Sequence, residues 1–351
     1  MLIRTDDYAF ERIPAPLLSW YRANKRDLPW RKECSPYKTW LSEIMLQQTR
    51  VEAARGYFER FVKALPTVQD LAACDEDVLM KLWEGLGYYS RARNLQKAAK
   101  QIVEEYGGQF PSDVRELQKL AGVGAYTAGA IASIAFGKRT PAVDGNVFRV
   151  ISRLTENPTP IDEPAFRPYL EEKLGAVYPE EGEDCVDFTQ SLMELGALLC
   201  TPTSPSCAEC PLAEICRAKK SGRQTDFPVK KAKPQKRVQR LYVFLIEGAD
   251  GVCVRKREGG VLKGSYEFPS YVIEKDETPE KVLNEWGVSA FTVLSTKKFT
   301  HIFTHIRWEM TAVYVRAESA PFAAYPLPVI EEKIPLPTAF RQCLSMLNGN
   351  H

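Results

Sequence analysis

The chain has 351 residues, of which 44% are hydrophobic and 26% are charged, and its formal net charge is +2. This length predicts two domains or slightly more, and the hydrophobic fraction is sufficient to fill their cores. The mixed charges of residues 1–12 indicate no signal peptide, and the longest weakly polar run, Ala128–Gly137, is too short to cross a bilayer. We therefore expect a cytoplasmic protein without membrane contact.

The first half of the chain contains residues that typically begin and end helices. Thr67, Asp75 and Ser112 are candidate N-caps, each placed shortly before an apolar run. A long helix is expected over Tyr89–Glu105 and should end at Gly107-Gly108. These signals predict an all-α first half.

Glu43 lies in the helical segment WLSEIMLQQT, residues 40–49. The core face of this helix is formed by four apolar residues, Trp40, Leu41, Ile44 and Met45. Glu43 shares the opposite face with Gln47 and Arg50, so the pattern alone predicts a solvated surface carboxylate.

The segment Leu117–Ala128 predicts two helices joined by the tight turn Gly122-Val123-Gly124. Glycines let a phosphate approach the backbone, and the start of a helix favours negative charge. A helix-hairpin-helix can grip DNA in this way without recognising its sequence. A plain helix–helix turn is the alternative for the same pattern.

Asp144 precedes an amphipathic helix in the sequence VDGNVFRV, residues 143–150. In isolation its expected role is that of an N-cap. A carboxylate at a helix N-terminus is stabilised in its charged form, which also suits it to hold a developing cation.

Four cysteines follow with the spacing C-x6-C-x2-C-x5-C, namely Cys200, Cys207, Cys210 and Cys216. Structural zinc sites usually use two close C-x2-C pairs, and this run has one. Loops of unequal length suit the wider corners of a [4Fe–4S] cluster, which we favour over zinc or four unrelated buried thiols. Prolines in the run keep the ligands on a loop.

The second half of the chain begins after a basic, proline-containing stretch, residues 217–239, which predicts a linker. Leu241–Ile246 is a buried apolar run, and apolar residues alternate with polar ones from Ile306 to Tyr314, so both segments predict strands. A helix is expected around Pro279–Trp286. The second half is therefore α+β.

Taken together, several segments resemble a MutY-type adenine DNA glycosylase of the endonuclease III, or helix-hairpin-helix, superfamily. They are LPWR (28–31), SEIMLQQTRV (42–51), GLGYYSRARN (85–94), LAGVGAYTA (120–128), VDGNVFRV (143–150) and the cysteine run. The resemblance implies a base-excision repair enzyme that removes adenine mispaired with 8-oxoguanine or guanine.

The resemblance also implies residue roles in catalysis. Glu43, with a pKa raised by burial, would be the general acid that protonates adenine, and Asp144 would stabilise the oxocarbenium-like sugar or trap it covalently. Asn146 would orient the acids and Tyr126 would hydrogen-bond Asp144. Members that also cleave the strand carry lysine where this chain has Tyr126, so monofunctional hydrolysis with little or no lyase activity is implied.

Residues for DNA contact are implied in the same way. Gln48 and Tyr88 would be wedges that fill the space of the flipped base, and Gly122, Val123 and Gly124 would contact the backbone. The adenine pocket would be formed by Leu28, Trp30, Arg31, Leu46, Val51 and Gln190.

The second half resembles the MutT-like, or Nudix-like, domain of the family. The segment Glu277–Val288 lacks the dense acidic pairs that bind magnesium, so the domain is expected to bind rather than to hydrolyse. Recognition of 8-oxoguanine would fall to Phe303, Thr304 and His305, together with Thr49 and Leu86. The family more often has serine where this chain has Thr304.

The expected domains are a helical glycosylase domain at 1–216, the linker at 217–239 and the MutT-like domain at 240–351. The first contains a six-helix module at about 30–136 and an iron–sulfur module of 1–29 plus 137–216. We expect a monomer that binds duplex DNA with A:8-oxoguanine or A:G mispairs, and a replication or repair protein at the linker. Two alternatives are an endonuclease III-type lyase acting on oxidised pyrimidines and a catalytically silent lesion-binding protein.

Overall fold

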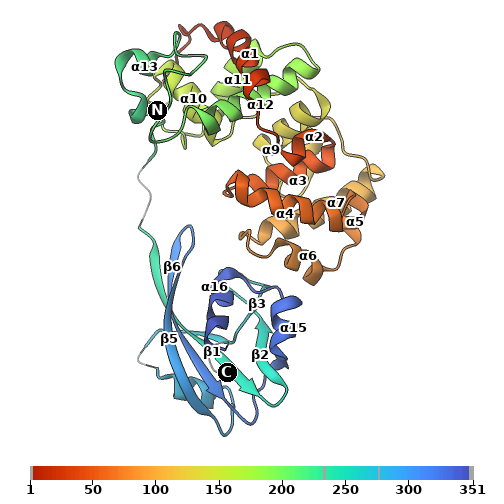
Figure 1. The fold of residues 1–351 in the computed structure, drawn as a ribbon, viewed down its shortest axis with the longest axis vertical. Helices are drawn as coiled ribbons and strands as arrows, with labels where there is room; N and C mark the ends of the chain where they lie inside the picture. The colour runs from red at the N-terminus through yellow and green to blue at the C-terminus, as the bar shows by residue number, and fades with distance from the viewer. Residues whose placement is uncertain (1–2, 232–234, 276, 348–351) are drawn as a thin grey trace. The chain divides into compact units, whose positions relative to one another are not determined.

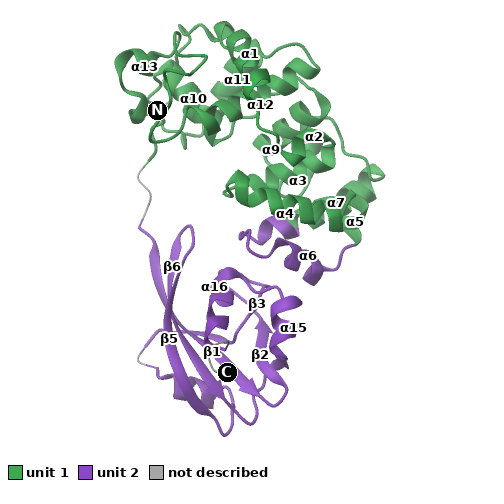
Figure 2. Ribbon diagram, viewed as in Figure 1, with its two compact units in different colours: residues 1–73, 94–232 green, residues 74–93, 233–351 purple. Residues whose placement is uncertain are grey.

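The computed structural model describes residues 3–231, 235–275 and 277–347. The chain forms two compact units, residues 1–73 with 94–232 and residues 74–93 with 233–351 (Figure 2). The first unit is helical, and the second is built around a β-sheet (Figure 1). No helix in the described part of the chain combines the length and apolar character that a membrane crossing needs.

Short helices joined by tight turns make up the first unit. Its α-helices are α1 (Pro14–Asn24), α2 (Pro29–Lys32), α3 (Pro36–Leu46), α4 (Val51–Ala64), α5 (Val68–Ala73), most of α7 (Ser90–Tyr106), α8 (Val114–Lys119), α9 (Ala125–Ala130), α10 (Gly145–Thr155), α11 (Phe166–Val177), α12 (Glu183–Leu198) and α13 (Arg217–Ser221). The 3-10 turns η1 (Phe10–Arg12) and η3 (Gln224–Asp226) and the π-helical turn η2 (Ile131–Ala135) complete it. The all-α character predicted for the first half is confirmed.

The helix caps largely follow the sequence signals. The Thr67 hydroxyl accepts a hydrogen bond from the amide of Asp70 at 3.1 Å, and Asp75 caps the helix that follows it. The cap predicted at Ser112 is wrong, because Asp113 accepts from the amides of Arg115 and Glu116 instead. A carboxylate one residue nearer the helix reaches both amides, as an N-cap must.

One core of the first unit joins the N-terminal residues to the segment that carries the cysteines. Phe10, Ile13 and Leu17 pack with residues of α10, α11 and α12 and with Phe227. The linker predicted at 217–239 is therefore too long. Residues 217–221 form α13, Phe227 is 3% exposed, and the amide of Ile161 donates to the carbonyl of Val229. The apolar side chains within the basic stretch bury against this core, so its charge alone did not indicate a solvated segment.

The second unit contains α6 (Glu76–Trp83), the start of α7 and a seven-stranded sheet. The strands are β1 (Arg237–Gly248), β2 (Gly251–Lys256), β3 (Tyr266–Glu267), β4 (Ser270–Val272), β5 (Thr292–Ile302), β6 (Ile306–Arg316) and β7 (Ala323–Tyr325). The main path is β3-β2-β1-β6-β5, with β4 on β1 and β7 on β2. Strands β1 and β6 are parallel, whereas β5 and β6 form a long antiparallel hairpin.

Helices cover both faces of this sheet. They are α14 (Pro279–Glu285), α15 (Leu327–Glu332) and α16 (Thr338–Arg341), with the 3-10 turn η4 (Gln342–Met346). Alternate β1 residues enter opposite cores: Leu241 and Val243 pack with α15, α16 and η4, and Phe244 packs with α14. Burial on both faces explains the unbroken apolar run in β1. The α+β prediction is confirmed.

Candidate functional site

Glu43 occupies the middle of α3, which begins at the Ser35 cap and a proline at its first position. Its side chain is buried, with 8% of the residue exposed. The surface position predicted from the apolar pattern is therefore wrong. Helix α9 packs against α3, which leaves no solvated face at this position.

The surroundings of Glu43 favour its protonated form. The pKa of Glu43 is raised to about 7, chiefly by burial and to a smaller extent by the charge of Asp144. A hydrogen bond donated by the Tyr126 hydroxyl and the charge of Arg31 act in the opposite direction. Tyr126 was expected to bond Asp144, and the structure gives its hydroxyl to Glu43 instead. A carboxyl group with a pKa near 7 can deliver a proton at neutral pH.

Asp144 is the N-cap of α10. Its carboxylate accepts from the amide of Val147 at 2.7 Å and from the Asn146 side-chain amide at 2.8 Å. Burial raises the pKa of Asp144 above its usual value, and these hydrogen bonds and Arg149 lower it. Asp144 thus has more hydrogen-bond donors than Glu43, and each of these donors favours the ionised form of its carboxylate. Asp144 is therefore both the N-cap of α10 and the second acid of the site.

Arg149 connects this cap to the cysteine loop. Its guanidinium donates to the side-chain oxygen of Asn146 at 2.7 Å, and to the carbonyls of Cys200 at 2.7 Å and Gly196 at 2.8 Å. One signal in the sequence indicates this role, because Arg149 follows Asn146 by three positions on a helix. We did not identify it from the sequence.

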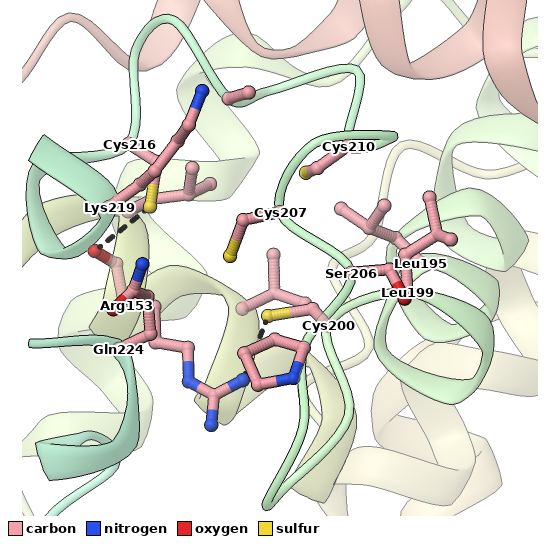
Figure 3. Close-up of a pocket in the computed structure, with 14 residues that line it drawn as sticks. Arg153, Leu195, Leu199, Cys200, Ser206, Cys207, Cys210, Cys216, Lys219 and Gln224 are labelled. Carbon is pink, nitrogen blue, oxygen red and sulfur yellow. Dashed lines mark hydrogen bonds between the residues drawn. The ribbon is translucent and has the colours of Figure 1, made fainter. Parts of the chain in front are cut away.

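The four cysteines line one cavity, and their side chains surround it (Figure 3). Burial raises the pKa of Cys210 to about 11, and the charges of the other three sulfurs raise it as well, which places the four thiols close together. In the described residues, no three His, Cys, Asp or Glu side chains are arranged to hold a single metal ion. Four thiols around a shared cavity fit the corners of an iron–sulfur cluster better than the vertices of one zinc ion.

Arg153, which is 2% exposed, supports the same loop. Its guanidinium donates to the Cys200 sulfur at 3.3 Å and to the carbonyls of Thr201, Pro202 and Phe227 at 2.7–3.0 Å. Its hydrogen bonds are with these carbonyls and the sulfur, so its charge is available to balance thiolates.

The residues predicted for the adenine pocket occupy different environments within the first unit. Leu28 and Trp30 are buried, and Trp30 packs edge-on against Phe58, whereas Leu46 and Val51 are half-buried. Gln190 accepts a hydrogen bond from the Tyr21 hydroxyl at 2.9 Å. Arg31 forms an ion pair with Glu194 at 2.9 Å, and its charge acts on Glu43. Glu194 could not be identified from the sequence, because nothing in the helical pattern distinguishes a buried carboxylate from a solvated one.

The two wedge candidates share a backbone property. Gln48 has a φ of 60° and Tyr88 a φ of 47°, and they are two of the five non-glycine residues with positive φ in the described part of the chain. Both side chains are exposed, and Thr49 beside Gln48 is half-buried. A left-handed backbone is strained for such residues and is found most often at functional sites.

The predicted helix-hairpin-helix is confirmed as α8, a turn and α9. Gly122 has a φ of 75°, and a Cβ at this position would lie 2.8 Å from that of Asn94, so glycine is required. Val123 is buried and anchors the turn. A Cβ built on Gly124, the cap of α9, would meet nothing within 4 Å, so its backbone is open to approach.

A second cavity, of about 540 Å³, lies within the second unit. Its lining comes from four segments, namely residues 85–90 with Arg93, 260–263, 301–305 and 337–339. Leu86 lies in its wall, and the hydroxyls of Tyr88 and Thr304 are 2.8 Å apart.

The three residues predicted to recognise the lesion differ in orientation. Thr304 and His305 are exposed at the β5–β6 turn. The ring of Phe303 instead packs edge-on against Trp308, with ring centroids 4.8 Å apart, and against His301. Phe303 therefore supports the turn, and Thr304 and His305 are its exposed side chains.

Three parts of the chain match known families. Residues 41–174 match the HhH-GPD superfamily of base excision DNA repair proteins, and residues 200–216 match the iron–sulfur binding domain of endonuclease III. Residues 242–346 match the NUDIX domain.

Similar curated proteins carry the name adenine DNA glycosylase. The protein of Arabidopsis thaliana is 38% identical over 85% of this chain and 56% of its own length, and that of Homo sapiens is 34% identical over 83% and 64%. The chain therefore spans less than two thirds of these two relatives. The protein of Buchnera aphidicola subsp. Schizaphis graminum (strain Sg) is 35% identical over 75% of both chains.

Solved structures match the helical part. A thermostable thymine-DNA glycosylase aligns with a TM-score of 0.55 and 27% identity, over 60% of this chain and 97% of its own. A trapped covalent intermediate of endonuclease III with DNA aligns with a TM-score of 0.51 and 26% identity, over 61% and 98%.

Proposed function

The chain belongs to the adenine DNA glycosylases of the HhH-GPD superfamily, and we propose that it removes adenine mispaired with 8-oxoguanine, or with guanine, from duplex DNA. The observation that carries the proposal is buried Glu43. Its pKa is about 7, and the charge of the second acid, Asp144, acts on it. Because its proposed substrate is DNA, we expect a cytoplasmic protein that associates with the nucleoid through DNA.

The two acids have complementary tasks in this proposal. Adenine leaves readily only after protonation, and Glu43 holds the required proton in a buried site. Departure of the base produces an oxocarbenium-like sugar. The Asp144 carboxylate, held by Asn146 and Val147, stabilises this charge as the paired carboxylates of glycosidases do.

We propose that the reaction stops at hydrolysis. A lyase of this superfamily needs an amine that attacks the sugar and forms a Schiff base. At that place the chain has Tyr126, whose pKa is raised well above its usual value by burial. Its hydroxyl therefore stays protonated and acts as a hydrogen-bond donor to Glu43.

DNA is proposed to bind along the hairpin and the two wedges. The open backbone at Gly124 suits a phosphate contact, and the strained, exposed Gln48 and Tyr88 suit insertion into the base stack. Leu28, Trp30, Arg31, Leu46, Val51 and Gln190 would then surround the flipped adenine.

The second unit is proposed to recognise 8-oxoguanine. Oxidation places a hydrogen on N7 of guanine, so a hydroxyl that accepts a hydrogen bond there distinguishes the lesion. The Thr304 hydroxyl can do so, since the Tyr88 hydroxyl beside it can accept its proton. The segment Glu277–Val288 contributes three acids, Glu277, Glu280 and Glu285, and no dense cluster, so we propose binding without diphosphate hydrolysis.

The protein contains an iron–sulfur cluster, which we propose is a single [4Fe–4S] group held by Cys200, Cys207, Cys210 and Cys216. Because four thiolates would ligate the four irons, the cluster would offer no open coordination site to substrate, and we propose that its role is structural. Arg149 and Arg153 tie the loop to α10, and Asp144 caps that helix. The loop thereby helps to fix the second acid.

The test is base release from matched duplexes. Adenine opposite 8-oxoguanine, adenine opposite guanine, adenine opposite thymine, and thymine glycol opposite adenine are each incubated with the protein. Strand breaks are scored before and after alkali, and borohydride trapping is scored in parallel. We expect alkali-dependent breaks with the first two duplexes and no trapped adduct. Release of thymine glycol with trapping would indicate a lyase, and no release would indicate a binding protein.

A further inference from the structure

Helix α12 presents a row of polar side chains to the end of α1, to the segment that follows it and to α2. Asp187, Gln190 and Glu194 follow one another at three- and four-residue steps, which places them on one face of the helix. Asp187 pairs with Arg22 at 2.9 Å, and Gln190 accepts from the Tyr21 hydroxyl. This polar row fixes the end of α1 and the chain that follows it.

Glu194 has the densest set of partners in this row. Its carboxylate accepts from Nε and the backbone amide of Arg26 at 2.9 Å each, and from another guanidinium nitrogen of Arg26 at 2.8 Å. Both terminal nitrogens of Arg31 donate to it as well, at 2.9 and 3.1 Å. The side chain is 1% exposed, so this carboxylate exists in the protein interior only because two arginines surround it.

Arg31 links this cluster to the proposed general acid. Its guanidinium lies over the Tyr21 ring at 5.6 Å and is close enough for its charge to act on Glu43. The other groups that act on Glu43 are the Tyr126 hydroxyl from α9 and the Asp144 carboxylate before α10. The position of the Arg31 guanidinium, and the extent to which its charge is neutralised, therefore affect the protonation of Glu43 on α3.

We infer that Glu194 is a positioning residue of the proposed adenine excision: it holds the Arg31 guanidinium in one orientation and offsets its positive charge, so that Glu43 retains its proton. The inference rests on the proposed function. Nothing in the role requires Glu194 to touch the substrate, because the ion pair transmits its effect through Arg31.

The sign of the effect follows from the charges. Glu43 acts in its protonated form, so the rate should fall as the pH rises through its pKa. Loss of the Glu194 charge leaves two uncompensated arginines, which favour the ionised form of Glu43 and lower its pKa. The falling limb of the pH–rate profile should then move to lower pH.

The experiment is the pH dependence of the single-turnover rate on an A:8-oxoguanine duplex, measured with the full-length protein containing its cluster. For Glu194→Gln, which keeps the shape but removes the charge, we expect the falling limb to move down by about half to one pH unit. Above the limb, this shift corresponds to a rate about three- to tenfold lower. The absorbance of the cluster reports whether the variant is folded.

Asp187→Asn is the matched control, since Asp187 is a buried carboxylate of the same helix that pairs with Arg22 rather than Arg31. Its limb should remain at the wild-type position. Glu194→Asp keeps the charge, so it should retain the wild-type limb even if its rate is lower. A folded Glu194→Gln variant with an unmoved limb would overturn the inference, because a merely structural role lowers the rate equally at every pH.

Arg31→Gln is an alternative test if Glu194→Gln does not fold. Removal of the cation should move the limb to higher pH, and adding Glu194→Gln to this background should cause little further shift. An unmoved limb in Arg31→Gln would contradict the inference. If the wild-type protein released no adenine at all, the proposed function itself would be wrong, so the two failures are distinguishable.

Discussion

The hydroxyl of Tyr126 donates a hydrogen bond to the carboxylate of Glu43, in a buried site whose other acid is Asp144. This bond is stronger when Glu43 is ionised, so it lowers the pKa of a group that burial raises. The opposing effects leave the pKa of Glu43 at about 7. Tyr126 therefore sets the pH range over which Glu43 can donate a proton.

We predict that Tyr126→Phe moves the falling limb of the pH–rate profile upward, by up to about one unit, because the ionised form of Glu43 loses its donor. The direction is opposite to that expected for Glu194→Gln. Single-turnover rates between pH 5 and 9 measure it. A limb that moves downward would show that the hydroxyl does not stabilise the Glu43 carboxylate.

Glu43→Gln should abolish adenine release while duplex binding persists, because the amide keeps the shape but has no proton to give. The same change should raise stability at alkaline pH. The folded-state pKa of Glu43 lies above its unfolded value, so the native protein loses stability as the pH rises from about 4.5 to 7 and keeps that deficit above it.

Thermal unfolding at pH 5 and pH 8 checks the second part. Glu43→Gln should gain about 1–3 kcal/mol relative to the wild type at pH 8 and much less at pH 5. A variant less stable than the wild type at pH 8 would contradict the assigned burial cost, and near-normal adenine release would remove Glu43 from the role of acid.

Asp144→Asn separates the cap from the charge. Asparagine is as good an N-cap as aspartate, so α10 should persist, at a cost of about 1 kcal/mol for the single acceptor that must serve both Val147 and Asn146. The adenine-release rate should nevertheless fall by about 10²-fold or more, since the countercharge to the sugar is gone. If the variant released adenine at a near-normal rate, or if its loss of rate were no larger than its loss of folding stability accounts for, Asp144 would be only a helix cap.

Thr304→Val tests lesion recognition. Valine keeps the branched shape and removes the hydroxyl, so the preference for 8-oxoguanine over guanine opposite adenine should fall about two- to tenfold. Thr300→Val is the matched control, because Thr300 is exposed on β5, the strand that leads into the turn of Thr304, but does not line the cavity. The measurement is the ratio of rates on the two duplexes at one fixed salt concentration. An unchanged ratio would assign recognition to other residues.

Periodicity predicted the elements well where one side of an element faces solvent or where both faces are buried. The alternation in β6 and the unbroken run in β1 both correspond to observed strands. Periodicity failed for Glu43 because the polar face of α3 is covered by α9, and only the resemblance to a family indicated its role. The error at residues 217–229 has a similar cause, since Phe227 and Val229 bury within a basic stretch.

Ion pairs in the interior could not be predicted from the pattern. Glu194 and Arg153 are charged residues on helices, and Arg26 lies in the segment between α1 and α2. Sequence alone predicts a solvated side chain for all three. Their burial depends on partners far away in the chain, such as the carbonyl of Phe227 for Arg153. The assignment of residues 74–93 to the second unit likewise depends on packing that the chain order does not reveal.

In the proposed reaction, buried Glu43 supplies the proton for adenine release, and this role can be measured through the pH dependence of the single-turnover rate on an A:8-oxoguanine duplex. We expect a plateau at acidic pH and a fall as the pH rises through about 7, the pKa of Glu43. A rate that falls steadily without a plateau would indicate protonation of adenine by solvent. A rate that rises with pH would contradict the claim outright.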